Sequence, residues 1–136
     1  MVSGMAKNGT KPVLCILSTF AQRTYDQLMQ DLCLNNNPAA ILNYGASVYS
    51  MNDESHLGFF DIAMMSNIPN LVYLAPTSIE EHLAMVKYAM EQTEHPVAVR
   101  VPAGPIVSTG KEDTTDYSIL NKFEVTKEGK DVAIIG

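Results

Sequence analysis

The sequence lacks the short motifs that usually mark a self-contained catalytic site. It contains no G-x-G-x-x-G, no P-loop and no nucleophile elbow, and no Cys/His cluster has metal-ligand spacing. Its apolar stretches are far shorter than the roughly 18 residues that a membrane helix needs, and no leader with a cleavage site opens the chain. These absences argue against a phosphate-binding loop, a metal site and a membrane span, and they predict a cytoplasmic protein.

Basic residues and cysteines are also scarce. Nine Lys and Arg stand against 15 Asp and Glu, so the formal net charge is -6 and no basic stripe suits nucleic acid. Cys15 lies in an apolar run and Cys33 in a helical pattern. Both are interpreted as small buried hydrophobic residues of a reducing compartment, with a functional thiol as the less favoured alternative. The 136 residues, 46% of them hydrophobic, are enough for one domain with a continuous core.

What the sequence does contain is a regular alternation of short apolar runs and amphipathic segments. The apolar runs predict four strands, at Val13–Leu17, Ala39–Leu42, Leu71–Leu74 and Val97–Val101. Strands that alternate with helices indicate parallel pairing through right-handed crossovers, and strands that are apolar throughout indicate that both faces of the sheet are covered. The predicted fold class is α/β, a doubly wound and mainly parallel sheet with helices on both faces.

The helices between these strands have recognisable starts. One is expected to begin at a capping box in residues 19–22 and to run to about Leu34, and a second covers residues 57–64. The third begins at a capping box in residues 78–81. Its apolar stripe, which we expect to face the core, consists of Ile79, Leu83, Val86 and Met90.

The character of the chain changes after Pro105. Residues 108–118 are polar, as a linker would be, and Phe123–Thr126 and Val132–Ile135 are strand-like. We therefore divide the chain into a domain at residues 1–107 and a segment at 108–136 that holds a linker and the first strand or strands of a truncated following domain. The abrupt end of the last strand at Gly136 suggests that this domain has been removed.

A ligand is expected beyond the carboxyl ends of the parallel strands. The longest and most polar loop there ends at His56. One interpretation makes residues 52–56 a helix N-terminus with Ser55 as its cap; the other makes His56 a proton donor and acceptor at the mouth of the sheet. Phe20, on the first such loop, either packs against its own helix or offers a flat surface to a planar ring. His82 and His95 are interpreted as solvated surface residues.

Residues 17–27, which read LSTFAQRTYDQ, closely resemble the STF-x-QR-x-YDQ signature of deoxyxylulose-phosphate synthases. Further stretches of that family follow in the expected order, at residues 56–61, 68–70, 75–78 and 99–104. The first motif is quite specific, whereas the others are shared more widely among transketolase-like enzymes. The resemblance covers nearly the whole chain and identifies it with the pyrimidine-binding domain of a thiamine-diphosphate enzyme.

The resemblance implies a three-domain transferase that condenses pyruvate with glyceraldehyde 3-phosphate, on the path to isoprenoid precursors. It implies thiamine diphosphate as cofactor, with Mg²⁺ bound by a diphosphate-binding domain that this chain lacks, since no Gly-Asp-Gly is present. The glutamate that activates the cofactor belongs to a helix before Val2, so the chain alone is expected to be inactive. Its expected partners are the missing diphosphate-binding and C-terminal domains and a second copy in a homodimer.

Carried over residue by residue, the resemblance assigns three roles. Phe20 matches the aromatic that stacks on the pyrimidine, Arg23 the arginine beside that ring, and His56 the catalytic histidine that handles protons and substrate oxygen. Ser18 and Asn52 are the substrate-binding candidates, and no residue is assigned to a metal.

The chain also departs from the family pattern. Tyr44 and Gly45 stand where the synthases have an Asp-Arg pair, Asn52 stands for an aspartate, Ala103 for an arginine and Leu17 for a tyrosine. Two of these departures remove guanidinium groups suited to holding a phosphate. Two alternatives therefore stay open: a transketolase-like enzyme with a different acceptor, and a non-catalytic regulatory or assembly module of the same fold.

Overall fold

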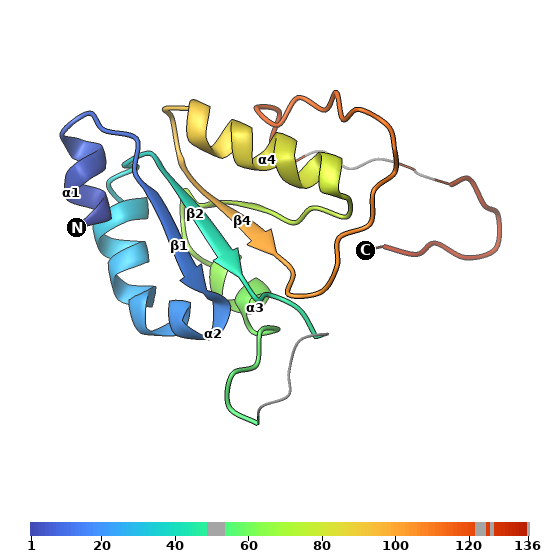
Figure 1. Ribbon diagram of the computed structural model, residues 1–136, viewed down its shortest axis with the longest axis horizontal. Coiled ribbons are helices and arrows are strands. Elements are labelled where there is room, and N and C mark those ends of the chain that lie inside the picture. Colours follow the sequence, from blue (N-terminus) through green and yellow to red (C-terminus); the bar gives the residue numbers. More distant parts are fainter. Residues whose placement is uncertain (49–53, 122–124, 126, 136) are drawn as a thin grey trace.

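One parallel sheet organises the molecule. In the computed structural model, the residues described below are 1–48, 54–121, 125 and 127–135. Within them, four strands pair in the order β1-β2-β4-β3, and every neighbouring pair is parallel (Figure 1). The strands are β1 (Val13–Leu17), β2 (Ala39–Tyr44), β3 (Val72–Leu74) and β4 (Pro96–Val101). The four predicted strands are thus confirmed, with ends that differ by at most two residues.

Helices lie on both faces of the sheet, as the alternating pattern predicted. On one face, Ile41 of β2 is in register with Leu14 and Ala98 and packs into a core with the helix that follows β1. On the other face, Val97 and Val99 pack against a long helix. The helices are α1 (Val2–Lys7), α2 (Ser18–Ala21), the 3-10 turn η1 (Gln22–Thr24), the π-helical η2 (Gln27–Cys33), α3 (Asp61–Met65) and α4 (Ile79–Glu91).

The helix after β1 starts earlier than its sequence predicted. It was expected to begin at a capping box on Thr19, but α2 begins at Ser18, directly after Leu17, and no side chain caps it. The capping box at Thr19 is therefore wrong, because no loop separates strand from helix and Thr19 is already in the first turn. At residues 78–81 the cap itself is confirmed, since Ser78 Oγ accepts the Glu81 N–H at 3.2 Å. The Glu81 carboxylate accepts the N–H of Thr77 at 2.7 Å instead of that of Ser78, so the reciprocal bond of the box is shifted by one residue.

The second predicted helix is much shorter than expected. It was assigned to residues 57–64, but α3 begins only at Asp61, and residues 54–60 form bends and turns. Phe60 occupies the position before the helix, so Ser55 is not its cap. His56 therefore lies on a loop, five residues before α3 begins.

The face of the sheet that α4 covers is only partly closed. The buried residues of α4 are Met85 and Ala89, whereas the predicted core stripe is largely outside, with Leu83 63% exposed. Ile79 and Met90 of that stripe are also exposed, as are Val13 and Cys15 of β1. The prediction that Cys15 is buried is therefore wrong, and the cover of this face is incomplete: α4 packs on β2 and β4, and Val13 and Cys15 of β1 stay exposed.

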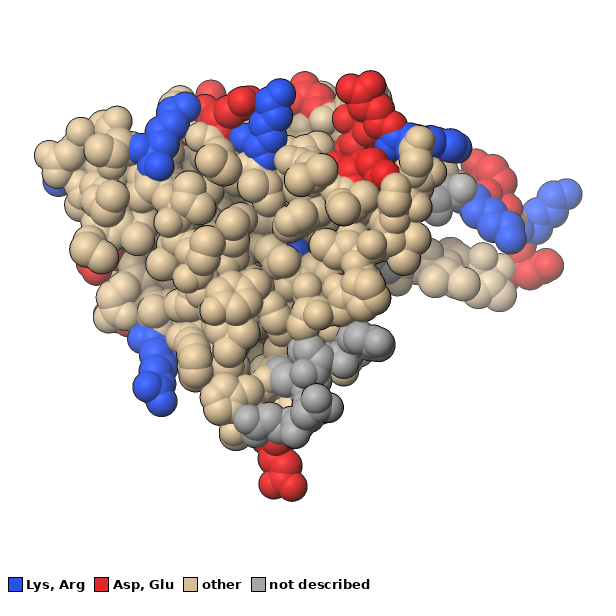
Figure 2. Space-filling view, in the orientation of Figure 1, with Lys and Arg blue, Asp and Glu red and all other residues tan. Residues whose placement is uncertain are grey.

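Figure 2 shows how charged residues are distributed on this side of the molecule. Lys and Arg alternate with Asp and Glu along the upper margin of this view, and the middle of the face, where Figure 1 draws β1 and β2, carries almost no charge. This face has no basic stripe of the kind that nucleic acid would require.

The segment after β4 is irregular but attached to the domain. The N–H of Ile79 donates to Val107 O at 3.1 Å, and the ring of Tyr117 lies 6.2 Å from that of Tyr88. The strand predicted at Val132–Ile135 is wrong, since these residues pair with no strand and Ile135 is 96% exposed. The predicted strand at Phe123–Thr126 falls largely outside the described residues, and the domain boundary at residue 107 stays a prediction.

In the described part of the chain, no helix combines the length and hydropathy needed to cross a bilayer.

Candidate functional site

The candidate site lies where the strands end. Because the sheet is parallel, the carboxyl ends of β1, β2 and β4 meet at one edge, next to α2 and α3 (Figure 1). Phe20 reaches this edge on α2, and His56 reaches it on the loop before α3. Their ring centroids are 5.4 Å apart and their planes are inclined by 80°, an edge-to-face contact. Two residues 36 positions apart in sequence are thus brought together, as the topology predicted.

Both rings remain accessible to a ligand. The side chain of Phe20 is 45% exposed, so it does not belong to the protein interior. His56 is partly exposed, and its Nδ1 lies 2.8 Å from Ser55 Oγ, a hydrogen bond that restrains the imidazole. The arrangement combines an aromatic surface with an imidazole, a group that can donate or accept a hydrogen bond.

Of the other three site residues predicted from the sequence, one is exposed, one is buried and one lies outside the described residues. Arg23 lies on η1, one turn beyond Phe20, and is exposed. Ser18 is the first residue of α2 and only 3% exposed, so its side chain is largely withdrawn from solvent. Asn52 lies outside the described residues.

Two glycines hold the loops of this edge in close contact. A Cβ added to Gly58 would lie 1.8 Å from the carbonyl oxygen of Gly45, so the loop that carries His56 rests directly on the loop after β2. Gly45 itself has φ +70, and a Cβ there would meet Leu17 Cδ1 at 2.8 Å. The ends of β1 and β2 and the His56 loop are therefore stacked through positions that only glycine fits.

A buried polar cluster lies beneath the same edge. Asp61 is 2% exposed, and its carboxylate accepts hydrogen bonds from Arg100 Nε at 2.7 Å, from Arg100 Nη2 at 3.3 Å and from the Tyr73 hydroxyl. Burial, and then the hydrogen bond to Asp61, raise the pKa of Tyr73. The same carboxylate raises the pKa of Arg100. The cluster ties the first residue of α3 to β3 and β4.

Asn43 of β2 adds an unusual group to this cluster. It is fully buried, in register with Arg100, and on the same face of the sheet. Neither polar atom of its side-chain amide has a hydrogen-bond partner among the described residues. A buried amide without partners is costly, so this position is a natural place for an ordered water.

The sequence analysis did not identify this cluster. A signal was available, because Arg100 is the one charged residue in the otherwise apolar strand β4 and its side chain had to find a carboxylate once buried. Asp61 directly follows two phenylalanines, which hid its burial. Among the described residues, no group of three or more His, Cys, Asp or Glu could hold a metal ion.

The histidines predicted to be solvated differ from one another. His95 is partly exposed and contacts Asn36 and Glu94 at the opposite edge of the sheet. His82 is less solvated than predicted: its Nδ1 is buried without a partner among the described residues, and burial lowers its pKa. Neither lies with Phe20 and His56.

Comparison with known proteins assigns the chain to a family. Residues 1–105 match the family described as "Transketolase, pyrimidine binding domain". The chain is 37% identical to 1-deoxy-D-xylulose-5-phosphate synthase of Clostridium acetobutylicum, over 99% of this chain and 22% of that protein. The corresponding enzymes of Halothermothrix orenii and Bacillus velezensis are each 38% identical over 99% of this chain and 21% of their own length.

A solved structure has the same fold. A split-gene transketolase, described as an inactive β4 tetramer, superimposes with a TM-score of 0.64 over 82% of this chain and 36% of its own, at 24% identity. The chain spans about a fifth of the length of its curated relatives. With the family match covering residues 1–105 of 136, the chain belongs to the transketolase pyrimidine-binding domain family.

Proposed function

We propose that this chain is the pyrimidine-binding part of a thiamine-diphosphate-dependent transketolase-type enzyme, most similar to the deoxyxylulose-phosphate synthases, which join pyruvate to glyceraldehyde 3-phosphate. The observation that carries the proposal is the contact between Phe20 and His56, at 5.4 Å, at the carboxyl edge of the sheet. Phe20 belongs to the stretch LSTFAQRTYDQ, which resembles the synthase signature.

The residues at this edge fit the pyrimidine ring of thiamine diphosphate. The half-exposed ring of Phe20 offers a surface on which a flat heterocycle can stack, and Arg23 follows one helical turn later. Bound thiamine diphosphate supplies a carbon nucleophile for attack on a 2-oxo acid. The part of His56 in this scheme is to hold or move a proton beside the substrate oxygen, in an orientation restrained by Ser55.

The proposal includes parts that this chain does not supply. We assign the Mg²⁺ that accompanies the diphosphate to a diphosphate-binding domain, and the activating glutamate to a helix before Val2. The exposed apolar residues on β1 and α4 support the presence of further domains or of a second copy in a homodimer. The chain alone is then inactive, and its cytoplasmic location stays a prediction from sequence.

One observation favours a second candidate, a transketolase-like enzyme with a different acceptor. Gly45 and Ala103 stand where the synthases have a guanidinium; both lie near the carboxyl edge, where Gly45 is partly exposed and Ala103 is exposed. Arg100 is bound to Asp61 and is not available to a substrate phosphate. The edge thus offers fewer cations to an aldehyde phosphate than the synthase pattern requires.

The experiment is a turnover assay of the complete enzyme, assembled with its diphosphate-binding domain. With thiamine diphosphate, Mg²⁺ and pyruvate, we expect carbon dioxide release that an aldehyde acceptor accelerates. Comparison of glyceraldehyde 3-phosphate with glyceraldehyde separates the two candidates, because only a phosphate-binding site favours the former strongly.

Two variants test the assigned residues in that assay. We expect Phe20→Ala to raise the half-saturating concentration of thiamine diphosphate about tenfold, for the loss of roughly 1.4 kcal/mol of ring contact. We expect His56→Asn to lower kcat by about a hundredfold or more. His95→Asn, at the opposite edge, is the matched control and should leave both values unchanged. No turnover by the complete wild-type enzyme would favour the non-catalytic module instead.

A further inference from the structure

The loop that carries His56 has two anchors among its described residues, both after His56 in the sequence. Near its middle, Gly58 rests on the backbone of Gly45. At its end, five residues after His56, Asp61 begins α3 with its carboxylate buried under the sheet edge. Between these anchors the chain forms turns, and Phe59 and Phe60 are both exposed. The segment that follows His56 is therefore held at Gly58 and again at Asp61.

The carboxylate of Asp61 is held by several hydrogen bonds. A carboxylate that is 2% exposed receives two hydrogen bonds from the guanidinium of Arg100 and one from the hydroxyl of Tyr73. These donors come from β4 and β3, which belong to the rigid parallel sheet. Charge-assisted bonds to a planar guanidinium also fix direction as well as distance. These hydrogen bonds therefore fix the position of the start of α3 relative to the sheet.

The other side of α3 is fixed against the helix that carries Phe20. α3 packs against α2, and the hydroxyl of Tyr25 donates to Asn67 just beyond the end of α3. The buried cluster and this second bond hold α3 between the sheet and the Phe20 segment. A shift at the start of α3 would therefore change the position of the His56 loop relative to Phe20.

We propose that Asp61, held by Arg100 and Tyr73, is a positioning residue that sets the His56 imidazole against the ring of Phe20. The importance of this positioning for catalysis rests on the proposed function, whereas the contact itself is a property of this chain. The buried amide of Asn43 lies beside this cluster, in register with Arg100 and on the same face of the sheet.

The test uses the imidazole proton signals of the 136-residue chain, which contains three histidines. The Phe20 ring shifts the His56 signal, and Phe20→Leu gives its position when that ring is absent. We expect Asp61→Asn to move the His56 signal more than halfway toward the Phe20→Leu position, with all variants recorded in the same alkaline buffer. The signals of His82, on α4 at the other face of the sheet, and of His95, at the amino edge, should stay where they are.

Two further variants make the result specific. Glu80→Gln alters another carboxylate that accepts several hydrogen bonds, at the start of α4, and should leave the His56 signal unchanged. Arg100→Lys keeps the charge but loses the paired bonds, and we expect it to move the His56 signal in the same direction as Asp61→Asn.

The decisive outcomes do not depend on thiamine diphosphate or turnover. If Asp61→Asn folds and leaves the His56 signal in place while lowering stability, the carboxylate is merely structural and the proposal is overturned. If Asp61→Asn does not fold, Arg100→Lys decides in the same way. A failed turnover assay with a shifted His56 signal would reject the proposed function and retain the positioning role.

Discussion

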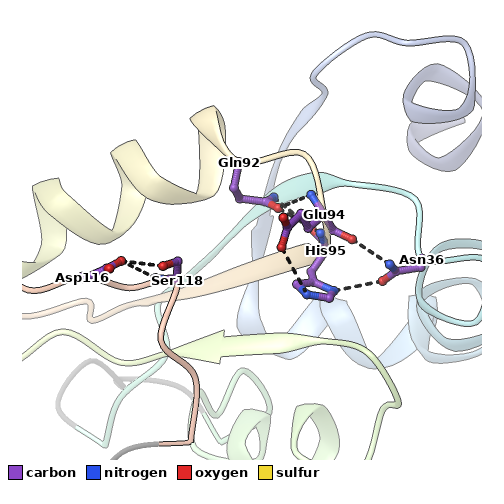
Figure 3. A network of polar contacts seen from close by, with 6 residues as sticks. All are labelled: Asn36, Gln92, Glu94, His95, Asp116 and Ser118. Atoms are coloured by element: carbon purple, nitrogen blue, oxygen red, sulfur yellow. Dashed lines mark hydrogen bonds and ion pairs between the residues drawn. The ribbon is translucent and has the colours of Figure 1, made fainter.

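The two edges of the sheet each hold a histidine, but they are built differently. At the carboxyl edge, His56 meets an aromatic ring above a buried Asp61–Arg100 pair. At the amino edge, His95 takes part in a network with Asn36, Gln92 and Glu94 (Figure 3), where Asn36 Nδ2 donates to Glu94 O at 2.7 Å.

The amino-edge network closes a turn rather than forming a site. The side chain of Gln92 accepts the N–H groups of Glu94 and His95 at 2.8 and 2.9 Å and donates to His95 O at 2.7 Å. These bonds satisfy backbone groups between the end of α4 and the start of β4. The comparison teaches that polar partners around a histidine do not indicate chemistry. The distinguishing features of the carboxyl edge are an accessible ring and buried charge.

The largest expected effect comes from Gly58→Ala at the carboxyl edge. The new Cβ would overlap the carbonyl oxygen of Gly45, so one backbone segment has to move. We expect a loss of about 2 kcal/mol or more in the free energy of unfolding, measured by urea denaturation, and a displaced His56 signal.

Gly4→Ala is the matched control for this change. Gly4 lies in α1 with no atom within 4 Å of an added Cβ, so the substitution should be neutral or slightly stabilising. Equal effects of the two substitutions would mean that the close contact at Gly58 does not exist in solution.

A smaller effect is expected from Gln92→Ala at the amino edge. The substitution leaves two N–H groups and a carbonyl of the turn without their side-chain partner, and should cost about 1 to 2 kcal/mol. Urea denaturation measures this loss. The His56 signal should not change, and any change there would show that the two edges are coupled.

The smallest effect is expected from Glu80→Gln, and it depends on pH. Glu80 accepts hydrogen bonds from Ser108, Thr109 and Gly110, and these lower its pKa from 4.5 to about 2. A carboxyl whose pKa is lower in the folded state stabilises the protein above its unfolded pKa, and this contribution disappears as the pH falls from about 4.5 to 2.

Urea denaturation midpoints measured over that acidic range give the test. The difference between the wild type and Glu80→Gln should be greatest near neutral pH and should shrink as the pH falls. A difference that does not vary with pH would mean that the carboxylate is not bound by residues 108–110 in solution.

The sequence predicted the fold better than it predicted the fit of the helices. Apolar runs identified all four strands, because the strands of a parallel sheet with helices on both faces contain few polar residues. The apolar stripe from Ile79 to Met90 was misassigned to the core. Such a pattern predicts a buried face, but it does not indicate whether the residues that bury it belong to the same chain. Cys15 was misassigned for the same reason, because β1 is apolar but uncovered on that face.

At the candidate site, sequence reasoning paired Phe20 with His56 because topology alone brings the loops of a parallel sheet to one edge. It did not find the Asp61–Arg100 pair, which depends on where α3 begins, or the Gly45–Gly58 contact, which depends on the height of one loop above another. Such distances are three-dimensional, and a local pattern of residue types does not encode them.

The unpaired outer edge of β1 has a consequence for the solubility of this protein. As the first strand in the order β1-β2-β4-β3, it has an outer edge with no neighbour in the described structure, and Val13–Leu17 contains no charge or proline to discourage a new one. Unprotected edges of this kind recruit strands from other molecules. The purified chain should therefore aggregate more readily as its concentration rises. A partner that pairs with the edge of β1 would prevent this aggregation.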